Sequence, residues 1–150
     1  MSQPVAAWPE PVERIASFLR AAGVEGRLEE LPSDAASPPG PAVRAEGFES
    51  TRGRLVALIP VKRTLDHERL AKAAKAASIR PSATPSFPFD HARVFIDRTV
   101  FAERVIWVHV APDHYVLGLP PEQLAHLTRA ERASLLLDDR AADGVDRRRG

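Results

Sequence analysis

The sequence predicts a mixed α+β domain in which helices flank a mixed β-sheet. Apolar residues recur with helical spacing near the start of the chain, at Val12, Ile15, Ala16 and Leu19. A nearly continuous apolar run over Leu55–Val61 is typical of a buried central strand. The other elements follow neither a regular strand–helix alternation nor an all-strand pattern, which favours a mixed sheet with helices packed against it.

The first 48 residues predict a helix, a strand, a loop and a second strand. The helix is expected over Pro11–Ala22, because proline suits a first helical turn and Gly23 suits a C-terminal cap. A short strand is expected over Arg27–Leu31. Residues 32–41 hold four prolines and one glycine, so they are expected to form a loop before a strand over Ala42–Phe48.

The middle of the chain predicts a second helix and then another loop. Asp66 is placed to cap a helix over His67–Ala77. Pro81–Pro88 is rich in proline and is expected to be a loop. A short strand over Val94–Ile96 is expected to end at Asp97.

The last third predicts a pair of strands followed by two helices. The strands are expected over Val105–Val110 and Tyr115–Leu119, and a helix begins near Pro121. Thr128 and Glu131 have the spacing of a capping box, which predicts a further helix through Leu135–Leu137.

Length and composition indicate one ordinary globular domain. Residues 1–10 are expected to be a lead-in, residues 11–138 a single domain, and residues 139–150 a disordered tail. The absence of cysteine excludes disulfides, thiolate metal ligands and a cysteine nucleophile. No apolar run approaches the roughly 20 residues of a membrane span, and the first residues lack a signal core, so a cytoplasmic location is expected.

The net charge of +1 argues against a protein that holds duplex DNA by its phosphates. Neither a duplex DNA partner nor a membrane partner is therefore expected. Residues 147–149 form an arginine cluster that is either a solvated tail or an RNA contact. The sequence does not indicate an oligomeric state.

Three separated stretches occur in an order found in a known protein family. They read Val-Arg-Ala-Glu-Gly-Phe at 43–48, Thr-Pro-Ser-Phe-Pro-Phe at 84–89 and His-Val-Ala-Pro-Asp-His at 109–114. Phe95-Ile96-Asp97 lies between the last two. In this order and spacing, from about Val12 to Leu127, the chain resembles the YbaK/prolyl-tRNA-editing family, whose members hydrolyse wrongly charged aminoacyl-tRNAs.

The resemblance implies a YbaK-type fold with a barrel-like sheet and a trans-acting aminoacyl-tRNA deacylase. Its substrate and partner would be a mischarged tRNA, cleaved at the ester on the 3′-terminal adenosine. No cofactor is implied, because a ribose hydroxyl and a water can attack this activated ester once the site positions them. The alternatives are a catalytically impaired member that binds tRNA, a nucleotide or a protein, and an enzyme acting on another small ester.

Arg44 is the first catalytic candidate that the resemblance implies. It stands where the family has a lysine that contacts the substrate near the terminal nucleotide. A guanidinium can hold a phosphate through two parallel hydrogen bonds but cannot serve as a base. The alternative is an exposed strand residue without a role in catalysis.

The stretch at 84–89 would form the substrate-binding loop, made of Thr84, Pro85, Ser86, Phe87, Pro88 and Phe89. Thr84 and Pro85 replace two family glycines, and proline lacks the N–H that could bind the ester carbonyl. Losing one such donor costs roughly 10²–10³ in rate. The alternative is a loop shaped by its prolines, with both phenylalanines in the core.

His114 is the second catalytic candidate, expected to border the amino-acid pocket beside the substrate-binding residues Ala111 and Pro112. The alternative is a structural hydrogen-bond partner at the start of a strand. Val110 stands where the family has a glycine, which narrows the expected pocket.

Other polar and aromatic residues are interpreted as structural. Asp97 is expected to cap a turn rather than to transfer protons, and Trp107 is expected in the core rather than as a base-stacking platform. No metal is expected, because no pair of the acidic and histidine side chains has diagnostic ligand spacing. The side chains considered are His91, His109, His114, Asp90, Asp97 and Asp113.

Overall fold

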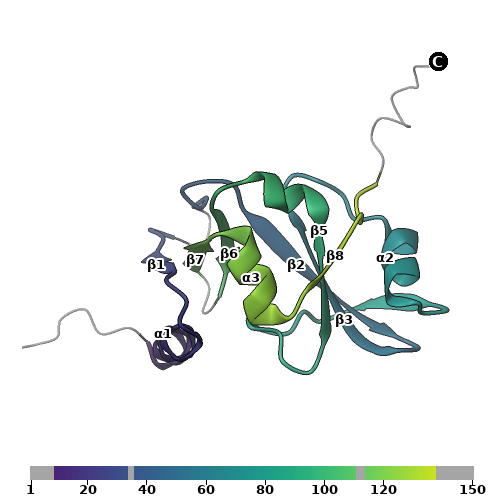
Figure 1. Cartoon of the computed structure of the whole chain (residues 1–150), viewed down its shortest axis with the longest axis horizontal. Helices are drawn as coiled ribbons and strands as arrows, with labels where there is room; N and C mark the ends of the chain where they lie inside the picture. The colour runs from purple at the N-terminus through teal and green to yellow at the C-terminus, as the bar shows by residue number, and fades with distance from the viewer. Residues whose placement is uncertain (1–8, 34–35, 111–113, 138–150) are drawn as a thin grey trace, which may run out of the picture.

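The structure is a computed structural model that describes residues 9–33, 36–110 and 114–137. Within these residues, three α-helices and a short 3₁₀ helix accompany two β-sheets (Figure 1). The helical elements are α1 (Glu10–Ala22), α2 (His67–Ala74), η1 (Arg98–Ala102) and α3 (Pro121–Thr128). The strands are β1 (Arg27–Glu30), β2 (Val43–Ser50), β3 (Gly53–Pro60), β4 (Ile79–Ser82), β5 (Arg93–Asp97), β6 (Ile106–His109), β7 (Tyr115–Leu119) and β8 (Glu131–Ala133).

The larger sheet has the strand order β4-β2-β3-β5-β8 and mixes both orientations, as predicted. β2 pairs antiparallel with β3 and β4, whereas β5 pairs parallel with β3 and β8. Leu55–Ile59 of β3 is fully buried, which confirms the buried central strand. Gly53 turns the chain between β2 and β3 with a φ of 96°, a conformation that glycine adopts without steric cost.

The smaller sheet has the order β1-β7-β6 and is antiparallel throughout. Helix α1 packs against it through Val12, Ile15 and Leu19. Gly23 ends this helix in the left-handed conformation, so the predicted cap is confirmed. The helix begins at Glu10, one residue before the expected start.

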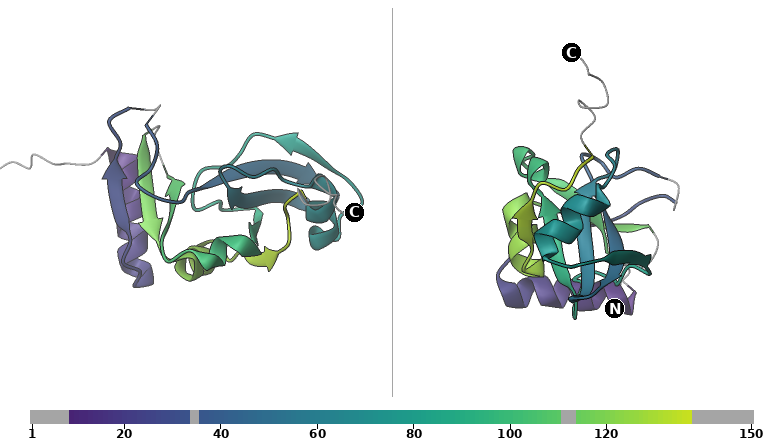
Figure 2. Two further views of the ribbon diagram at one scale, coloured as in Figure 1. Left: turned by 90° about the horizontal axis from the view of Figure 1, so that it is seen from above. Right: turned by 90° about the vertical axis from the view of Figure 1, so that its right-hand side faces the viewer.

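The mixed α+β fold is confirmed, but the strands do not close into the expected barrel-like sheet. Figure 2 shows the three-stranded sheet and α1 at one end of the molecule and the five-stranded sheet with α2 at the other. The two sheets meet at one parallel bridge between Ala42 and Trp107. On its other side this segment is bonded to the end of β3, where the Val61 N–H donates to the Ala42 carbonyl at 3.0 Å, and from Val43 on β2 pairs with β3.

Two boundaries differ from the prediction in the middle of the chain. Asp66 caps α2 as expected, accepting from the Glu68 N–H at 3.0 Å, but the helix ends at Ala74 because Lys75 turns left-handed. Residues 79–82 form β4, although Pro81 predicted a loop. Proline is tolerated there because β4 is an edge strand with one unpaired side.

The predicted helix starting at Thr128 is wrong. Thr128 is instead the last residue of α3, and its hydroxyl donates to the Leu124 carbonyl at 2.8 Å. Arg129 then adopts a left-handed conformation, and residues 131–133 join β5 as the parallel strand β8. A long-range strand partner therefore overrides the local capping signal.

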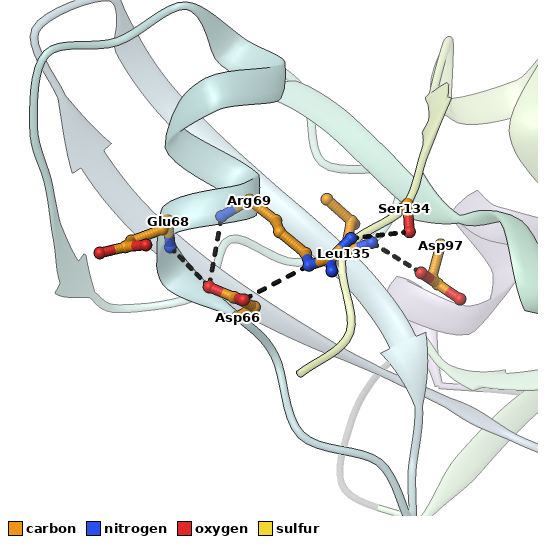
Figure 3. A network of polar contacts seen from close by, with 6 residues as sticks. All are labelled: Asp66, Glu68, Arg69, Asp97, Ser134 and Leu135. Carbon is orange, nitrogen blue, oxygen red and sulfur yellow. Dashed lines mark hydrogen bonds and ion pairs between the residues drawn. The ribbon is translucent and has the colours of Figure 1, made fainter. Parts of the chain in front are cut away.

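Asp97 and Trp107 have the structural roles that their patterns predict. Asp97 is 1% exposed and caps η1 by accepting from the Thr99 N–H at 2.9 Å. It also accepts from the Leu135 N–H at 2.8 Å (Figure 3). Trp107 is buried against Leu31 and Val116. A Cβ on Gly118 would lie 2.6 Å from its ring, so the indole requires glycine there.

In the described part of the chain, no helix is both long and apolar enough to cross a bilayer. The expected tail at 139–150, the arginine cluster within it and residues 1–8 of the lead-in lie outside the described residues.

Candidate functional site

A groove of about 650 Å³ lies where the start of β2, the 84–89 loop and the end of β6 come together. This volume is in the range of sites that hold small molecules. Its described lining comprises Pro11, Val43, Arg44, Ala45, Thr84, Pro85, Ser86, Phe87, Phe89, Val108, His109 and Val110. The structure thus brings Arg44 together with the predicted substrate loop, except Pro88, which does not line the groove.

The substrate loop is held against β2 by a close backbone approach at Gly47. A Cβ on Gly47 would lie 2.7 Å from the Ala83 carbonyl oxygen and 2.9 Å from the Thr84 Cα. Those distances are shorter than side chains tolerate, so glycine is required where the loop crosses the strand. The Thr84 hydroxyl also reaches the Ala45 carbonyl at 3.4 Å.

The aromatic residues of the loop belong to the core and to the groove at once. Phe87 and Phe89 are buried and meet edge to face, with ring centroids 5.8 Å apart. Phe18 of α1 meets Phe87 in the same manner at 6.3 Å. The two readings of this loop are therefore compatible, since buried rings hold the backbone that borders the groove.

Arg44 reaches the groove with its guanidinium already paired. Nη1 donates to the Val61 carbonyl at 2.6 Å, while Nε and Nη2 contact Glu46 Oε2 at 2.9 and 2.8 Å. The side chain remains 38% exposed. A ligand phosphate at Arg44 would therefore share the guanidinium with a carboxylate.

His114 does not line the groove. It precedes β7, and its Nε2 lies 3.0 Å from Oε2 of Glu30 in β1, at the edge of the small sheet opposite β6. Its ring also stacks on Tyr115 with centroids 5.2 Å apart. The expected neighbours Ala111 and Pro112 lie outside the described residues.

Comparison with solved structures identifies the fold. A proposed trans-editing enzyme for prolyl-tRNA synthetase superposes with a TM-score of 0.76 at 16% identity, covering 87% of this chain and 99% of that one. A hypothetical protein gives 0.71 at 14% identity, covering 83% and 99%. The chain has a YbaK-like fold.

The YbaK-like fold also occurs as part of a larger protein. A proposed signal transduction protein from Marinobacter aquaeolei VT8 matches with a TM-score of 0.67 at 19% identity, covering 88% of this chain but 31% of that one. No family model and no curated protein matches the sequence. At these identities the likeness shows the fold alone.

In this YbaK-like fold, the histidine that lines the groove is His109, at the end of β6. The resemblance directed attention to His114, five residues later, and sequence reasoning gave His109 no role in catalysis. The alternation of side chains along β6 was the sequence feature that could have singled out His109. Val108 and Val110 are buried, so the residue between them faces away from that core.

The carboxylate of Glu30 links His114 to Tyr115. Burial raises the pKa of the Tyr115 phenol, and the charge of Glu30, which accepts its hydrogen bond, raises this pKa further. The Glu30–His114–Tyr115 cluster therefore ties β1 to β7. This arrangement agrees with the alternative reading of His114 as a structural partner.

Proposed function

We propose that this protein is a trans-acting aminoacyl-tRNA deacylase that hydrolyses the ester of mischarged tRNA. The observation that carries the proposal is the groove itself. Arg44 and the 84–89 loop, singled out by their sequence resemblance, border one groove in a YbaK-like fold although 40 positions separate residue 44 from residue 84.

The groove offers the two environments that an aminoacyl ester needs. Val43, Ala45, Val108 and Val110 provide an apolar lining that suits the amino-acid part. Arg44 provides a positive charge for the terminal adenosine or its phosphate. Because the ester is already activated, the site needs to position the ribose hydroxyl, the ester and a water rather than supply a nucleophile.

The proposed partner is the acylated 3′ end of a tRNA, and the proposed location is the cytoplasm. A net charge of +1 predicts modest affinity that falls with added salt, since few phosphates are neutralised. Recognition would therefore depend on the acylated end in the groove more than on the body of the tRNA.

A second candidate is a binding module that holds tRNA, a nucleotide or a protein without hydrolysis. The observation that favours it is the ion pair from Glu46 to Arg44, which offsets the charge available to a ligand. Pro85 also favours a binding module, because this groove residue has no backbone N–H to donate to a developing oxyanion.

The deciding experiment measures amino-acid release from a panel of mischarged tRNAs. The enzyme hypothesis predicts turnover that Arg44→Ala reduces by about tenfold or more, from the loss of a charge-assisted contact. Arg54→Ala is the matched control, because Arg54 also forms an exposed pair with a glutamate of β2, Glu49 at 3.2 Å, but lies outside the groove. Saturable binding without release would instead support the binding module.

A further inference from the structure

His109 carries the one imidazole among the described groove residues. The other polar side chains of the described lining are Arg44, Thr84 and Ser86. Guanidinium stays protonated and hydroxyls stay neutral at this pH, whereas imidazole changes its charge between about pH 5 and 8. A proton acceptor within the described groove would therefore be His109.

The bridge between the two sheets places Arg44 and His109 at matching positions of their strands. Ala42 and Trp107 form a parallel bridge, and the Trp107 N–H donates to the Pro41 carbonyl at 2.9 Å. Two residues further along each strand stand Arg44 and His109. Alternate side chains of a strand share a face, so both leave the bridge on the same side, and both residues border the groove.

Few of the described groove residues carry a charge. From β2 the groove receives Arg44, whose guanidinium is paired with Glu46 and with the Val61 carbonyl. From β7 the register partner of His109 is the uncharged Val116, followed towards the chain start by Tyr115, whose hydroxyl is bound to Glu30.

The remaining walls of the groove add no charge of their own. The loop contributes only the hydroxyls of Thr84 and Ser86. From α1 the groove receives Pro11, and the neighbouring Glu10 pairs with Arg14 at 3.5 Å. No carboxylate lines the described groove and competes for the role of base.

We infer that His109 is the general base and acid of the proposed deacylation. This inference rests on the proposed function. The imidazole takes a proton from the attacking water as its oxygen bonds to the ester carbonyl carbon. The bond from that carbon to the ribose oxygen then breaks, and the imidazolium returns the proton to this oxygen. The products are the free amino acid and a tRNA with a 3′-terminal hydroxyl.

The test compares His109→Gln with His114→Gln in steady-state deacylation across pH 5 to 9. The wild type is expected to lose activity at acid pH, because a protonated imidazole cannot act as a general base. His109→Gln lowers kcat by about 10²–10⁴-fold with little change in KM and removes this pH dependence. His114→Gln retains it, because His114 lies outside the groove.

Added imidazole provides a second readout that a purely structural role would not move. It restores activity to His109→Ala, where a space for the ring is left, and has no effect on Arg44→Ala. The unfolding curve of His109→Gln is expected to overlap that of the wild type, since the His109 side chain is exposed to solvent.

The outcomes separate the inference from the proposed function. The assignment of His109 is overturned if the wild type hydrolyses mischarged tRNA and His109→Gln has the same kcat. It is also overturned if His114→Gln loses more activity than His109→Gln. In both cases the proposed deacylase function stands. If the wild type releases no amino acid from any mischarged tRNA, the proposed function fails and the inference falls with it.

Discussion

The pKa of Tyr115 shows how the surroundings of one side chain change its chemistry. Tyr115 is the only tyrosine in the chain and is 7% exposed, with its hydroxyl bound to Glu30. Burial first, and the Glu30 charge second, hold its pKa above the ordinary value of 10.0. Both effects favour the neutral phenol in the folded state.

The first prediction concerns stability at alkaline pH. Because the folded pKa is raised, the stabilising contribution is fully present below pH 10.0 and is lost as pH rises through the folded pKa. Tyr115→Phe is therefore expected to lose less stability than the wild type above pH 10. Urea unfolding of both proteins between pH 8 and 11 measures the difference.

Direct titration of tyrosinate absorbance provides the control, because one tyrosine is present. Glu30→Gln should lower the measured pKa while leaving it above 10.0, since burial is the larger cause. A folded wild type that titrates at or below 10.0 would contradict this account.

Arg44 and His114 illustrate the limits of a motif at the residue scale. Both were chosen by resemblance, yet only Arg44 borders the groove. His114 Nε2 instead lies 3.0 Å from Oε2 of Glu30 in β1. A motif specifies which residue occurs at a position, but the partner on the neighbouring strand decides where its side chain lies.

At the scale of elements, the crossing of the 84–89 loop over β2 shapes the groove. Gly47→Ala is expected to lower the free energy of unfolding by about 1–3 kcal/mol, because the new methyl group overlaps backbone atoms of Ala83 and Thr84. Chemical denaturation measures this loss. Glu49→Ala in the same strand is the control, with an expected change within about 0.5 kcal/mol, because its side chain is on the surface.

The proposed function adds a second consequence of this substitution. Displacing the loop would also alter the groove, so Gly47→Ala should reduce deacylation more than its stability loss explains. Unchanged stability and activity in Gly47→Ala would show that the loop can move away from β2 at little cost.

The connection from β5 to the end of the described chain depends on Asp97. Its two carboxylate oxygens accept from the backbone of Thr99 and of Leu135, so η1 and the segment after β8 share one buried anchor. Asp97→Ala is expected to lose about 1–3 kcal/mol, because the buried Leu135 N–H is left unpaired. It should also speed hydrogen exchange at the Leu135 amide.

Asp66 provides the matched comparison for this element. It caps α2 through the Glu68 N–H, but its side chain is 23% exposed, so water can replace it. Asp66→Ala should cost about 0.5–2 kcal/mol and leave exchange at Leu135 unchanged. An equal cost for both variants would argue against the buried anchor.

At the scale of the whole molecule, the division into two sheets creates the groove. The sheets are joined at the Ala42–Trp107 bridge, and the groove lies just beyond it, where β2 and β6 no longer pair. A closed barrel would have continued that pairing past the bridge. The open junction leaves room for a ligand between Arg44 and the end of β6.

Much of the fold could be predicted because its signals are local. The helical stripe of α1 and its Gly23 cap, the apolar run of β3 and the Asp66 cap each depend on neighbours within a few residues. The groove could be predicted in part, since Arg44 and the loop were both expected to contribute. The helix after Thr128 was predicted wrongly, because pairing with β5 outweighed its capping spacing.

By itself the sequence determined most of the element types, the buried strand and the resemblance to editing proteins, because periodicity, proline, glycine and motif order are properties of the chain. The tertiary structure alone decided that the strands form two sheets, that β8 is a strand, and that His109 rather than His114 borders the groove. The physical reason is that strand partners are distant in sequence. Which residues share a face and a groove depends on register, which only the folded chain sets.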